Sequence, residues 1–579
     1  MTGRLSTRYA GNQRYLEHIY ASRRDWMLEP FQHRGQPWVL EPLRSQKAEL
    51  SWAGEYAGKW LDAACLAAAG GQDPRLEQQA QEFAPALAAT QAADGYLGIE
   101  LPPKREVDWD LWNVKYSLTG LLTHYQVYHD PASLQTALRG AEWLMNRFGV
   151  IADVSSAFYN SPSEGGVSVD IVDQLVRLHQ FTRDGRVLAF VSSILAHFPY
   201  IKAMRATGQA VLTHAYMLSS YLGGYVEWAG AAGQADELRW VEQVWENLVN
   251  RHLYPTGSLG FREHLREMAP NDTPIDHGQP DRHHQETCAT VEWLLFNSRL
   301  YQATGQARYM HAMEQTIYNA LLAAQSTDGM QWLYYLPLRY EKTWFTGPTS
   351  CCYWSGPRGI ARLPGWVYAL DDDGLRVNLY EASRANLQVQ GQGVRIEQLS
   401  DFPDSGQVVL RIEPARPMPF TLRLRIPAYA HVTAARLNDG ALGAAAGPGE
   451  YLEIERQWAS GDQVRLQFDI AATTRRFLND DYGVLVRGPE VLSVDQRDNS
   501  TLDLDQIQLD SHTPLQAVEP AHGRRRYAGL ARVHSQPTPV IFTPYADCGG
   551  HGARFRTALP IVPAAHSNST ETQDAFRPA

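Results

Sequence analysis

The sequence is poor in cysteine. It has 5 cysteines among 579 residues, and two of them, Cys351 and Cys352, are adjacent. A sparse, odd-numbered set of thiols does not suit a disulfide framework and is typical of a reducing compartment. The N-terminal stretch MTGRLSTRYAGNQRYLEHIY also lacks the apolar segment and small-residue cleavage site of a secretory signal. We therefore expect a cytoplasmic protein whose thiols are free or bind a metal.

Long hydrophobic runs and excess positive charge are also missing. No apolar run approaches the ~18 residues of a membrane-spanning helix, so we expect no membrane segment. The formal net charge is −11, which disfavours nucleic acid and anionic membranes as partners. Aromatic residues, in contrast, are plentiful, with 16 Trp and 28 Tyr. Their flat rings with polar tips suit stacking on sugars as well as packing between helices.

Helical hairpins are expected from about residue 50 to 370. Apolar-periodic stretches such as WNVKYSLTGLLTHYQVY alternate there with the recurring turns GGQDPRL, YHDPASL, TRDGRVL and AGQADEL. A repeat of helical hairpins builds either a solenoid or a closed ring. About six hairpins would suit an α/α toroid with a substrate cleft at its centre. The repeat by itself does not establish that the ring closes.

The periodicity changes after residue 372. LRVNLY, FTLRLRIP, YLEIERQW and VRLQFDI alternate apolar and polar residues and are separated by Gly, Asp, Asn and Pro turns. This pattern predicts β-sandwich strands. We expect a helical catalytic domain over residues 1–372, a β-sandwich over 373–475 and a second β-sandwich over 476–579.

Two segments contain the residues that could bind a metal. Glu286 and Cys288 belong to QETCAT, and Cys351 and Cys352 to TSCCYW. Three thiolates and one carboxylate form a plausible tetrahedral set for zinc. Zinc ribbons, however, use Cys-x-x-Cys pairs, which this chain does not have at these positions. The spacing alone therefore leaves buried, inert thiols as an equally open interpretation.

The same segments resemble a known enzyme family. QETCATVEWLLF, followed by TSCCYWSGPRGIARLP, is similar to glycoside hydrolase family 127 and its relative family 146, the β-L-arabinofuranosidases and related enzymes. YPTGSLGFREHL, YGVLVRGPEVL and TPYADCGGHGARF extend the resemblance over essentially the whole chain. The resemblance implies an (α/α)6 barrel followed by β-sandwich domains. It also implies a glycoside or oligosaccharide substrate, and it allows a homodimer.

The resemblance assigns the metal ligands and the nucleophile. It implies that Glu286, Cys288, Cys351 and Cys352 bind one zinc ion (Zn2+). Cys351, the first of the adjacent pair, would also be the nucleophile of a retaining glycosidase, in place of the usual carboxylate. Zinc would hold that thiol deprotonated at neutral pH.

Other roles follow from the same resemblance. Glu263, in FREHL, would be the general acid/base, and Glu267 is a competing glutamate nearby. His214, in VLTHAYML, and Tyr334, in LYYLPL, fall where the family places sugar-contacting residues. The resemblance therefore predicts a site drawn from four separate stretches of the chain.

The chain also departs from the family pattern. Tyr116 and Ser168 align where characterised members have sugar-binding histidines. Tyr353 and Trp354 follow the cysteine pair, in a segment whose sequence differs from the family's usual one. We expect the two rings to stack on a sugar. Arg358 would suit an acidic sugar, although a structural ion pair is the favoured interpretation. These departures predict retained catalytic chemistry with an open sugar specificity.

Two alternatives to a glycosidase are compatible with the toroid. One is a polysaccharide lyase or sugar epimerase that uses His214 or a tyrosine as the base. The other is a carbohydrate-binding protein in which zinc only stabilises the fold. A covalent sugar adduct on Cys351 would distinguish the glycosidase from both.

Overall fold

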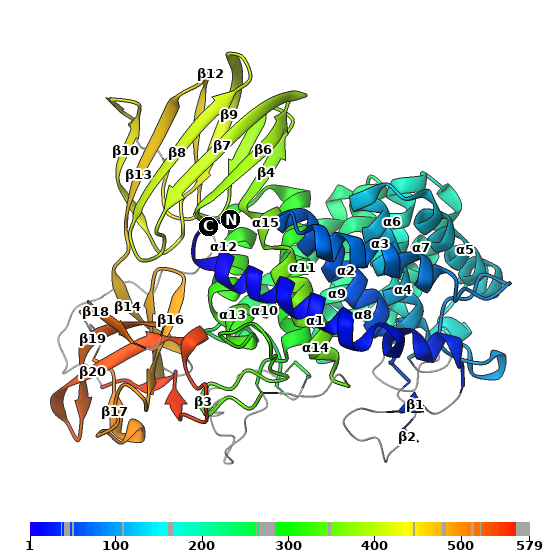
Figure 1. Cartoon of the computed structure of the whole chain (residues 1–579), viewed down its shortest axis with the longest axis horizontal. Coiled ribbons are helices and arrows are strands. Elements are labelled where there is room, and N and C mark those ends of the chain that lie inside the picture. The colour runs from blue at the N-terminus through cyan, green and yellow to red at the C-terminus, as the bar shows by residue number, and fades with distance from the viewer. Residues whose placement is uncertain are drawn as a thin grey trace.

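The structure is a computed structural model of the chain. It describes residues 1–35, 38–39, 47–48, 51–106, 109–159, 166–261, 263–265, 284–344, 349–443, 446–477, 482–510, 514–521 and 523–562. A large helical domain lies beside β-sheets that come from the C-terminal part of the chain (Figure 1). This arrangement confirms the predicted fold class of an α/α barrel followed by β-domains.

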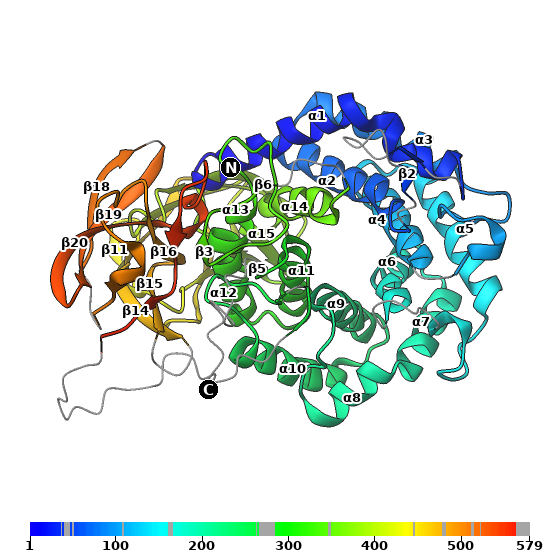
Figure 2. The same ribbon diagram turned by 90° about the horizontal axis from the view of Figure 1, so that it is seen from below.

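The helical domain is a closed double ring (Figure 2). Its inner helices are α2 (Glu55–Gly71), α4 (Asp110–Tyr128), α6 (Val172–Thr182), α9 (Ala215–Ala231), α11 (Thr287–Thr304) and α14 (Cys351–Ala361). Each packs against the next, and α14 packs against α2. This last contact closes the ring, which the sequence repeat did not establish.

The outer ring contains the remaining long helices. They are α1 (Arg4–Gln32), α3 (Pro74–Ala88), α5 (Pro131–Phe148), α7 (Gly185–His197), α8 (Pro199–Thr207), α10 (Leu238–Arg251) and α12 (Ala307–Thr316). Shorter helices are α13 (Leu322–Ala324), α15 (Leu363–Val367), the π-helix η5 (Ile317–Leu321) and the 3-10 helices η1 (Pro102–Lys104), η2 (Ala157–Tyr159), η3 (Val167–Ile171), η4 (Ala235–Glu237), η6 (Leu504–Gln506) and η7 (Tyr545–Asp547). Among the described residues no single helix is long and apolar enough to cross a bilayer, although α7 and α8, bent by 65°, pass that test together by length and composition.

Three aspartates explain why the recurring turns begin new helices. Asp73, Asp130 and Asp184 are the N-cap residues of α3, α5 and α7. Each carboxylate accepts hydrogen bonds from free backbone N–H groups of the first helical turn. Proline occupies the first helical position after two of these caps, where its missing N–H costs nothing. The turns read from the sequence are therefore true hairpin turns.

The N-terminal helix α1 was not among the predicted hairpins, which began near residue 50. It packs against α2, α3 and α14. The last hairpin of the ring is thus built from the two ends of the helical domain. A search for neighbouring repeats misses such a pair because its two helices are separated by most of that domain in sequence.

Two β-sheets face each other in the first β-domain and enclose a core of their own. One contains β4 (Tyr368–Asp371), β5 (Gly374–Val377), β9 (Met418–Arg425) and β12 (Tyr451–Trp458). The other contains β6 (Ser383–Val389), β7 (Gln392–Ser400), β8 (Gln407–Pro414), β10 (His431–Leu437), β11 (Gly440–Ala441) and β13 (Asp462–Asp469). Residues alternate between buried and exposed along β8 and β13, as the period-two pattern predicted.

In the part of the second β-domain that the structure describes, the strands join into one hydrogen-bonded sheet. It contains β14 (Ala472–Phe477), β15 (Tyr482–Arg487), β16 (Glu490–Asp495), β17 (Ile507–Gln508), β18 (Gln516–Ala521), β19 (Arg524–Val533), β20 (Gln536–Pro544), β21 (Phe555–Arg556) and β22 (Leu559–Pro560). The helical domain adds β3 (Arg339–Tyr340), which pairs with β21. A separate hairpin pairs β1 (Trp38–Val39) with β2 (Lys47–Ala48).

A buried ion pair joins the helical domain to the β-sandwich. Arg425 of β9 donates to Glu314 of α12 at 2.6 Å, and both side chains are inaccessible to solvent. The Tyr429 hydroxyl donates to the other oxygen of Glu314 at 2.8 Å. Because both carboxylate oxygens are satisfied, the charge of Arg425 is compensated inside the interface.

The inner helices α2 and α4 touch through their backbones. A Cβ added to Gly58 would lie 1.8 Å from the carbonyl oxygen of Tyr116, and one added to Gly120 would lie 2.9 Å from the carbonyl oxygen of Gly58. Helices approach this closely only where side chains are absent. The contact fixes the separation of the two helices beside the centre of the ring.

We predict that Gly58→Ala lowers the free energy of unfolding by about 1–3 kcal/mol or more, because the new methyl group must push α2 and α4 apart. Gly230→Ala is the matched control. Gly230 lies in the inner helix α9, and an added Cβ meets no atom within 4 Å. This substitution should keep or raise stability, by up to about 1 kcal/mol. Thermal and denaturant unfolding of the two variants test the contact, and equal effects would contradict it.

Candidate active site and metal centre

The start of α11 provides two of the predicted metal ligands. Glu286 is the N-cap residue with extended backbone, and Cys288 lies in the first helical turn. The Thr287 N–H donates to the Tyr334 carbonyl at 2.9 Å, which holds this turn against the segment that follows α13. The change from extended to helical backbone lets side chains two residues apart point to the same place.

The start of α14 provides the other two. Ser350 is its N-cap residue, and Cys351 and Cys352 are the first two residues of the helix. The beginnings of α11 and α14 therefore meet at one point. Helix N-termini carry partial positive charge and free N–H groups, which favour thiolates and carboxylates. This placement explains why the adjacent cysteines are the first residues of a helix.

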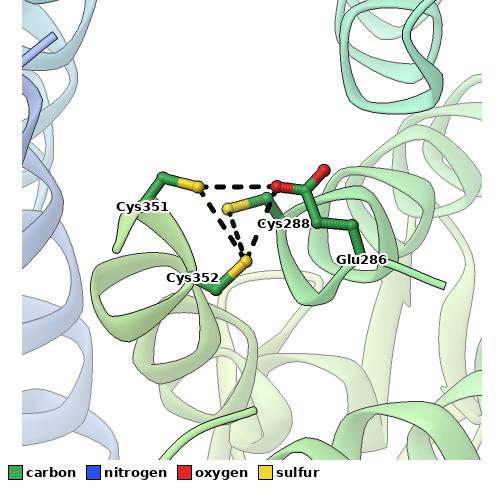
Figure 3. Close-up of side chains that lie close together, drawn as sticks. All are labelled: Glu286, Cys288, Cys351 and Cys352. Atoms are coloured by element: carbon green, nitrogen blue, oxygen red, sulfur yellow. Dashed lines mark hydrogen bonds between the residues drawn. The ribbon is translucent and has the colours of Figure 1, made fainter. Parts of the chain in front are cut away.

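The four side chains form one compact cluster (Figure 3). Their ligand atoms all lie within 4.8 Å of one another. Glu286 Oε1 lies 3.4 Å from Cys351 Sγ and 3.5 Å from Cys352 Sγ. Cys352 Sγ lies 3.4 Å from Cys288 Sγ and 3.9 Å from Cys351 Sγ. The tertiary structure thus brings together all four predicted ligands.

The charges of this cluster fit a bound cation. Burial and the neighbouring Cys351 raise the pKa of Glu286, and the hydrogen bond that Cys351 donates to Cys288 raises the pKa of Cys351. Burial opposes ionisation of Cys288, yet hydrogen bonds from the other two thiols lower its pKa to about 7. Glu286 Oε2 is buried and has no hydrogen-bond partner among the described residues. Four possible ligand groups that cannot all ionise side by side without a nearby positive charge match what a metal ion requires.

A cavity of about 340 Å³ opens beside the cluster, which therefore has access to a ligand. Cys351 lines this cavity and is partly exposed, whereas Cys352 is fully buried. Glu263 lines the same cavity and accepts hydrogen bonds from the Tyr334 hydroxyl at 2.5 Å and the Tyr335 hydroxyl at 2.9 Å. The Tyr334 hydroxyl also lies 3.8 Å from Cys351 Sγ.

The backbone at Glu263 is held in an unusual conformation. Its φ is +71°, in a region of backbone conformation that most residues other than glycine and asparagine rarely adopt. The carbonyl oxygen of Glu263 accepts a hydrogen bond from the Ala215 N–H at 2.8 Å, at the start of α9. Such local strain is found preferentially at functional sites, where the surrounding structure maintains it.

His214 also lines the cavity, as the resemblance implied. It is the N-cap residue of α9, and its Nδ1 accepts a hydrogen bond from the Tyr216 N–H at 3.2 Å. Burial lowers the pKa of His214 to about 4, against the opposing effect of Glu263. At neutral pH the ring is therefore uncharged with its proton on Nε2, because Nδ1 is an acceptor. His214 is thus a hydrogen-bond donor at the cavity.

Two predicted sugar-stacking residues lie elsewhere. Trp354 is buried and packs against both Trp26 and Tyr56, with ring centroids at 6.0 and 5.1 Å. Tyr353 packs edge-on against Tyr15 at 5.1 Å. Neither is among the residues that line the cavity. The predicted stacking of a sugar on these two rings therefore finds no support in this geometry, because helix α14 turns both rings into the protein core.

Other predicted positions are structural or lie outside the described residues. Glu267 is outside them. Tyr116 and Ser168 are buried and do not line the cavity. Arg358 donates to Asp62 at 2.9 Å and to Glu292 at 3.0 Å inside the ring. This agrees with its interpretation as a structural ion-pair partner rather than a ligand for an acidic sugar.

The sequence interpretation did not identify a second part of the cavity wall. Trp52, Trp109 and Trp112 line it, together with Glu55. The first two tryptophans lie just before α2 and α4, and Trp112 and Glu55 lie in the first turns of these helices. Their shared position near the starts of inner helices was a usable signal, because the residues around the cluster occupy the same end of α11 and α14.

The comparisons with known proteins agree with this geometry. The family model of the GH127 β-L-arabinofuranosidase catalytic domain matches residues 6–365, and that of the GH127 middle domain matches residues 374–470. The chain belongs to the GH127 β-L-arabinofuranosidase family. It is therefore a β-L-arabinofuranosidase-like glycosidase. This membership favours hydrolysis over the lyase, epimerase and binding-protein alternatives.

Similar GH127 proteins are distant in sequence. A non-reducing end β-L-arabinofuranosidase of Bifidobacterium longum subsp. longum is 23% identical over 517 residues, which covers 76% of this chain and 75% of that protein. The crystal structure of a GH127 β-L-arabinofuranosidase from Geobacillus stearothermophilus T6 has a TM-score of 0.82 at 20% identity, covering 97% of this chain and 99% of that one. A second solved GH127 β-arabinofuranosidase has a TM-score of 0.79 at 22% identity, covering 97% and 96%. These structures share the complete fold.

We predict that the purified protein binds about one metal ion per chain, because four donors converge at one point. Cys352→Ala should remove most of this metal, and chelator should lower the melting temperature of the wild type but not that of the variant. Elemental analysis and thermal unfolding measure both effects.

Cys65→Ala is the matched control for this prediction. Cys65 is another fully buried cysteine, and it lies in α2 outside the cluster. This variant should keep the metal content and the response to chelator. Equal metal content in Cys352→Ala and Cys65→Ala would contradict the assignment of the metal centre.

Proposed function

We propose that this chain is a zinc-dependent retaining glycosidase that releases terminal β-L-arabinofuranose or a closely related sugar from plant glycans. Cys351 is the nucleophile and Glu263 the general acid/base. The family membership supports the reaction class. The names of the two β-L-arabinofuranosidases that resemble this chain support the sugar.

One observation supports this mechanism above the others. Cys351 and Glu263 line the same cavity and are linked through the Tyr334 hydroxyl, which donates to Glu263 Oε1 and lies 3.8 Å from Cys351 Sγ. A retaining glycosidase needs a nucleophile and an acid/base on either side of one sugar bond. The other two thiols are buried at the back of the cluster. Only Cys351 among the three is partly exposed.

The reaction follows from these positions. Cys351 Sγ forms a bond with the anomeric carbon while the bond from that carbon to the leaving oxygen breaks, and the Glu263 proton moves to the leaving oxygen. A water molecule then attacks the same carbon, Glu263 takes its proton, and the C–S bond breaks. Two displacements at one carbon retain its configuration. Tyr334 and Tyr335 hold the Glu263 carboxyl in place through both steps.

The donor set fits zinc. Three sulfurs and one carboxylate oxygen correspond to the ligands and coordination number that zinc prefers. When bound, zinc would keep the cysteines deprotonated at neutral pH, where burial otherwise favours the neutral thiols. Glu286 would complete the set through the oxygen that faces the thiols.

The cavity suits one sugar unit at the end of a chain. Its volume of about 340 Å³ lies at the lower end of the range for small-molecule sites. A cavity of this size encloses one monosaccharide and leaves the remainder of the substrate outside. Removal of a single terminal unit is consistent with this size.

The thiol chemistry also supports a location for the protein. All five cysteines are free thiols in the structure. A nucleophilic thiol next to two others is sensitive to oxidation, so a reducing compartment preserves it. We therefore propose a cytoplasmic location, and detection of the activity in the cytosolic fraction of the cells that produce the protein would test this.

We predict that Cys351→Ser lowers kcat on an aryl β-L-arabinofuranoside by at least about 1,000-fold, because it removes the nucleophile. Glu263→Gln should lower kcat by about 100- to 10,000-fold and keep the metal content and melting temperature. With a good leaving group, Glu263→Gln should accumulate a covalent adduct with the mass of one glycosyl unit. Intact-mass measurement and peptide mapping should place it on Cys351.

Cys65→Ser should keep wild-type turnover, because Cys65 is remote from the cavity. Near-normal turnover by Cys351→Ser would exclude the thiolate mechanism. An adduct mapped to a carboxylate would do the same. Turnover of a different aryl glycoside with the adduct still on Cys351 would correct the sugar and leave the mechanism intact.

A further inference from the structure

One carboxylate at the cavity belongs neither to the thiol cluster nor to the Glu263 group. Glu55 is the first residue of α2, is fully buried and lines the cavity together with Cys351. Its Oε2 accepts hydrogen bonds from Lys59 Nζ at 2.7 Å and from the Trp112 indole N–H. Its Oε1 is buried and has no hydrogen-bond partner among the described residues.

The neighbours of Glu55 hold its carboxylate so that Oε1 can accept a hydrogen bond from a ligand. Lys59 is fully buried, and its ammonium lies 4.5 Å from the centre of the Tyr116 ring, which holds it in place on its other side. Lys59 and Trp112 together fix the orientation of the Glu55 carboxylate. A buried acceptor without a donor is unfavourable, because it has lost its hydrogen bonds to water and gained none in return. A bound ligand with a hydroxyl group supplies that donor.

The remaining lining residues define the class of ligand. Three tryptophans, Trp52, Trp109 and Trp112, give an apolar wall that suits the C–H face of a sugar. Among the described residues that line the cavity there are three glutamates and neither lysine nor arginine. A sugar carboxylate would lie among negative groups without a cationic partner. A neutral sugar, in contrast, offers hydroxyl donors to them.

We propose that Glu55 is a specificity-determining residue. Its Oε1 accepts a hydrogen bond from one hydroxyl group of the neutral sugar that lies over Cys351, and its charge disfavours sugars that carry a carboxylate. The proposal rests on the proposed function only in placing the sugar in this cavity, and it does not depend on which neutral sugar is bound.

The test compares one aryl glycoside that the wild type hydrolyses with its deoxy derivatives, each lacking one hydroxyl group. Glu55→Gln should lower kcat/KM on the parent by about 10-fold, since a hydrogen bond to a charged acceptor is roughly twice as strong as a neutral one. The double variant Glu55→Met/Lys59→Met, which removes both buried charges together, should lower it by about 10- to 100-fold. On the single deoxy derivative that lacks the partner hydroxyl, both variants should match the wild type within about threefold.

Glu314→Gln is the matched control. Glu314 is also fully buried, pairs with one cation, Arg425, and lies at the β-domain interface away from the cavity. It should lower the melting temperature without changing the ranking of parent and deoxy substrates. Equal losses of kcat/KM for Glu55→Gln on the parent and on every deoxy derivative would overturn the proposal, because a merely structural role affects all substrates alike. Unchanged kcat/KM on the parent would also overturn it.

Binding provides a readout that does not need turnover. Quenching of cavity tryptophan fluorescence should report binding of the neutral monosaccharide, with an affinity about 10-fold weaker in Glu55→Gln. The matching uronic acid should bind more weakly than the neutral sugar to the wild type, and this difference should shrink in Glu55→Gln. Tighter wild-type binding of the uronic acid would overturn the proposal. If the wild type ignores arabinofuranosides while this pattern holds for another neutral sugar, the proposed substrate fails and the role of Glu55 stands.

Discussion

The convergence of two helix starts, those of α11 and α14, is the constraint on which the site depends. It places three thiols and one carboxylate within 4.8 Å of one another in a buried position. Groups that favour negative charge cannot all ionise at such distances without a cation, and the raised pKa values of Glu286, Cys351 and Cys352 express this. The positive ends of both helices reduce the cost but do not remove it. A bound metal ion would offset this repulsion.

Closure of the ring makes that convergence precise enough for catalysis. Helix α14 packs between α11 and α2, so its first residues face α11 on one side and the start of α2 on the other. Cys351 and Glu55 thereby line the same cavity. Backbone contact between Gly58 of α2 and Tyr116 of α4 fixes the cavity wall in turn. The cavity is the space that these closely packed helices leave at one end of the ring.

The predicted departures from the family pattern lie outside the cavity lining. The positions where the resemblance implied histidines, Tyr116 and Ser168, are buried away from the cavity. Tyr116 instead packs its ring against Lys59, the partner of Glu55. Tryptophans from the starts of α2 and α4 complete the wall. Tyr116 is thus connected through Lys59 to Glu55, the carboxylate proposed to bind the sugar.

Local sequence determined the elements of the helical domain and the identity of the metal ligands. Asp73, Asp130 and Asp184 cap helices because a carboxylate satisfies free N–H groups within its own turn, a relation that needs no tertiary contact. The adjacent cysteines and the Glu-Thr-Cys segment could likewise be recognised from the sequence as candidate metal ligands, since the chain has few other cysteines.

Only the tertiary structure decided how these elements meet. It paired α1 with α14, closed the ring through α14 and α2, turned Tyr353 and Trp354 into the core and brought Trp52, Trp109 and Glu55 to the cavity. These outcomes depend on packing between segments far apart in the chain, where the direction of each side chain follows from the helix it belongs to and from the neighbours it meets. Composition and periodicity describe a single segment, and they therefore could not predict which face of α14 meets the sugar.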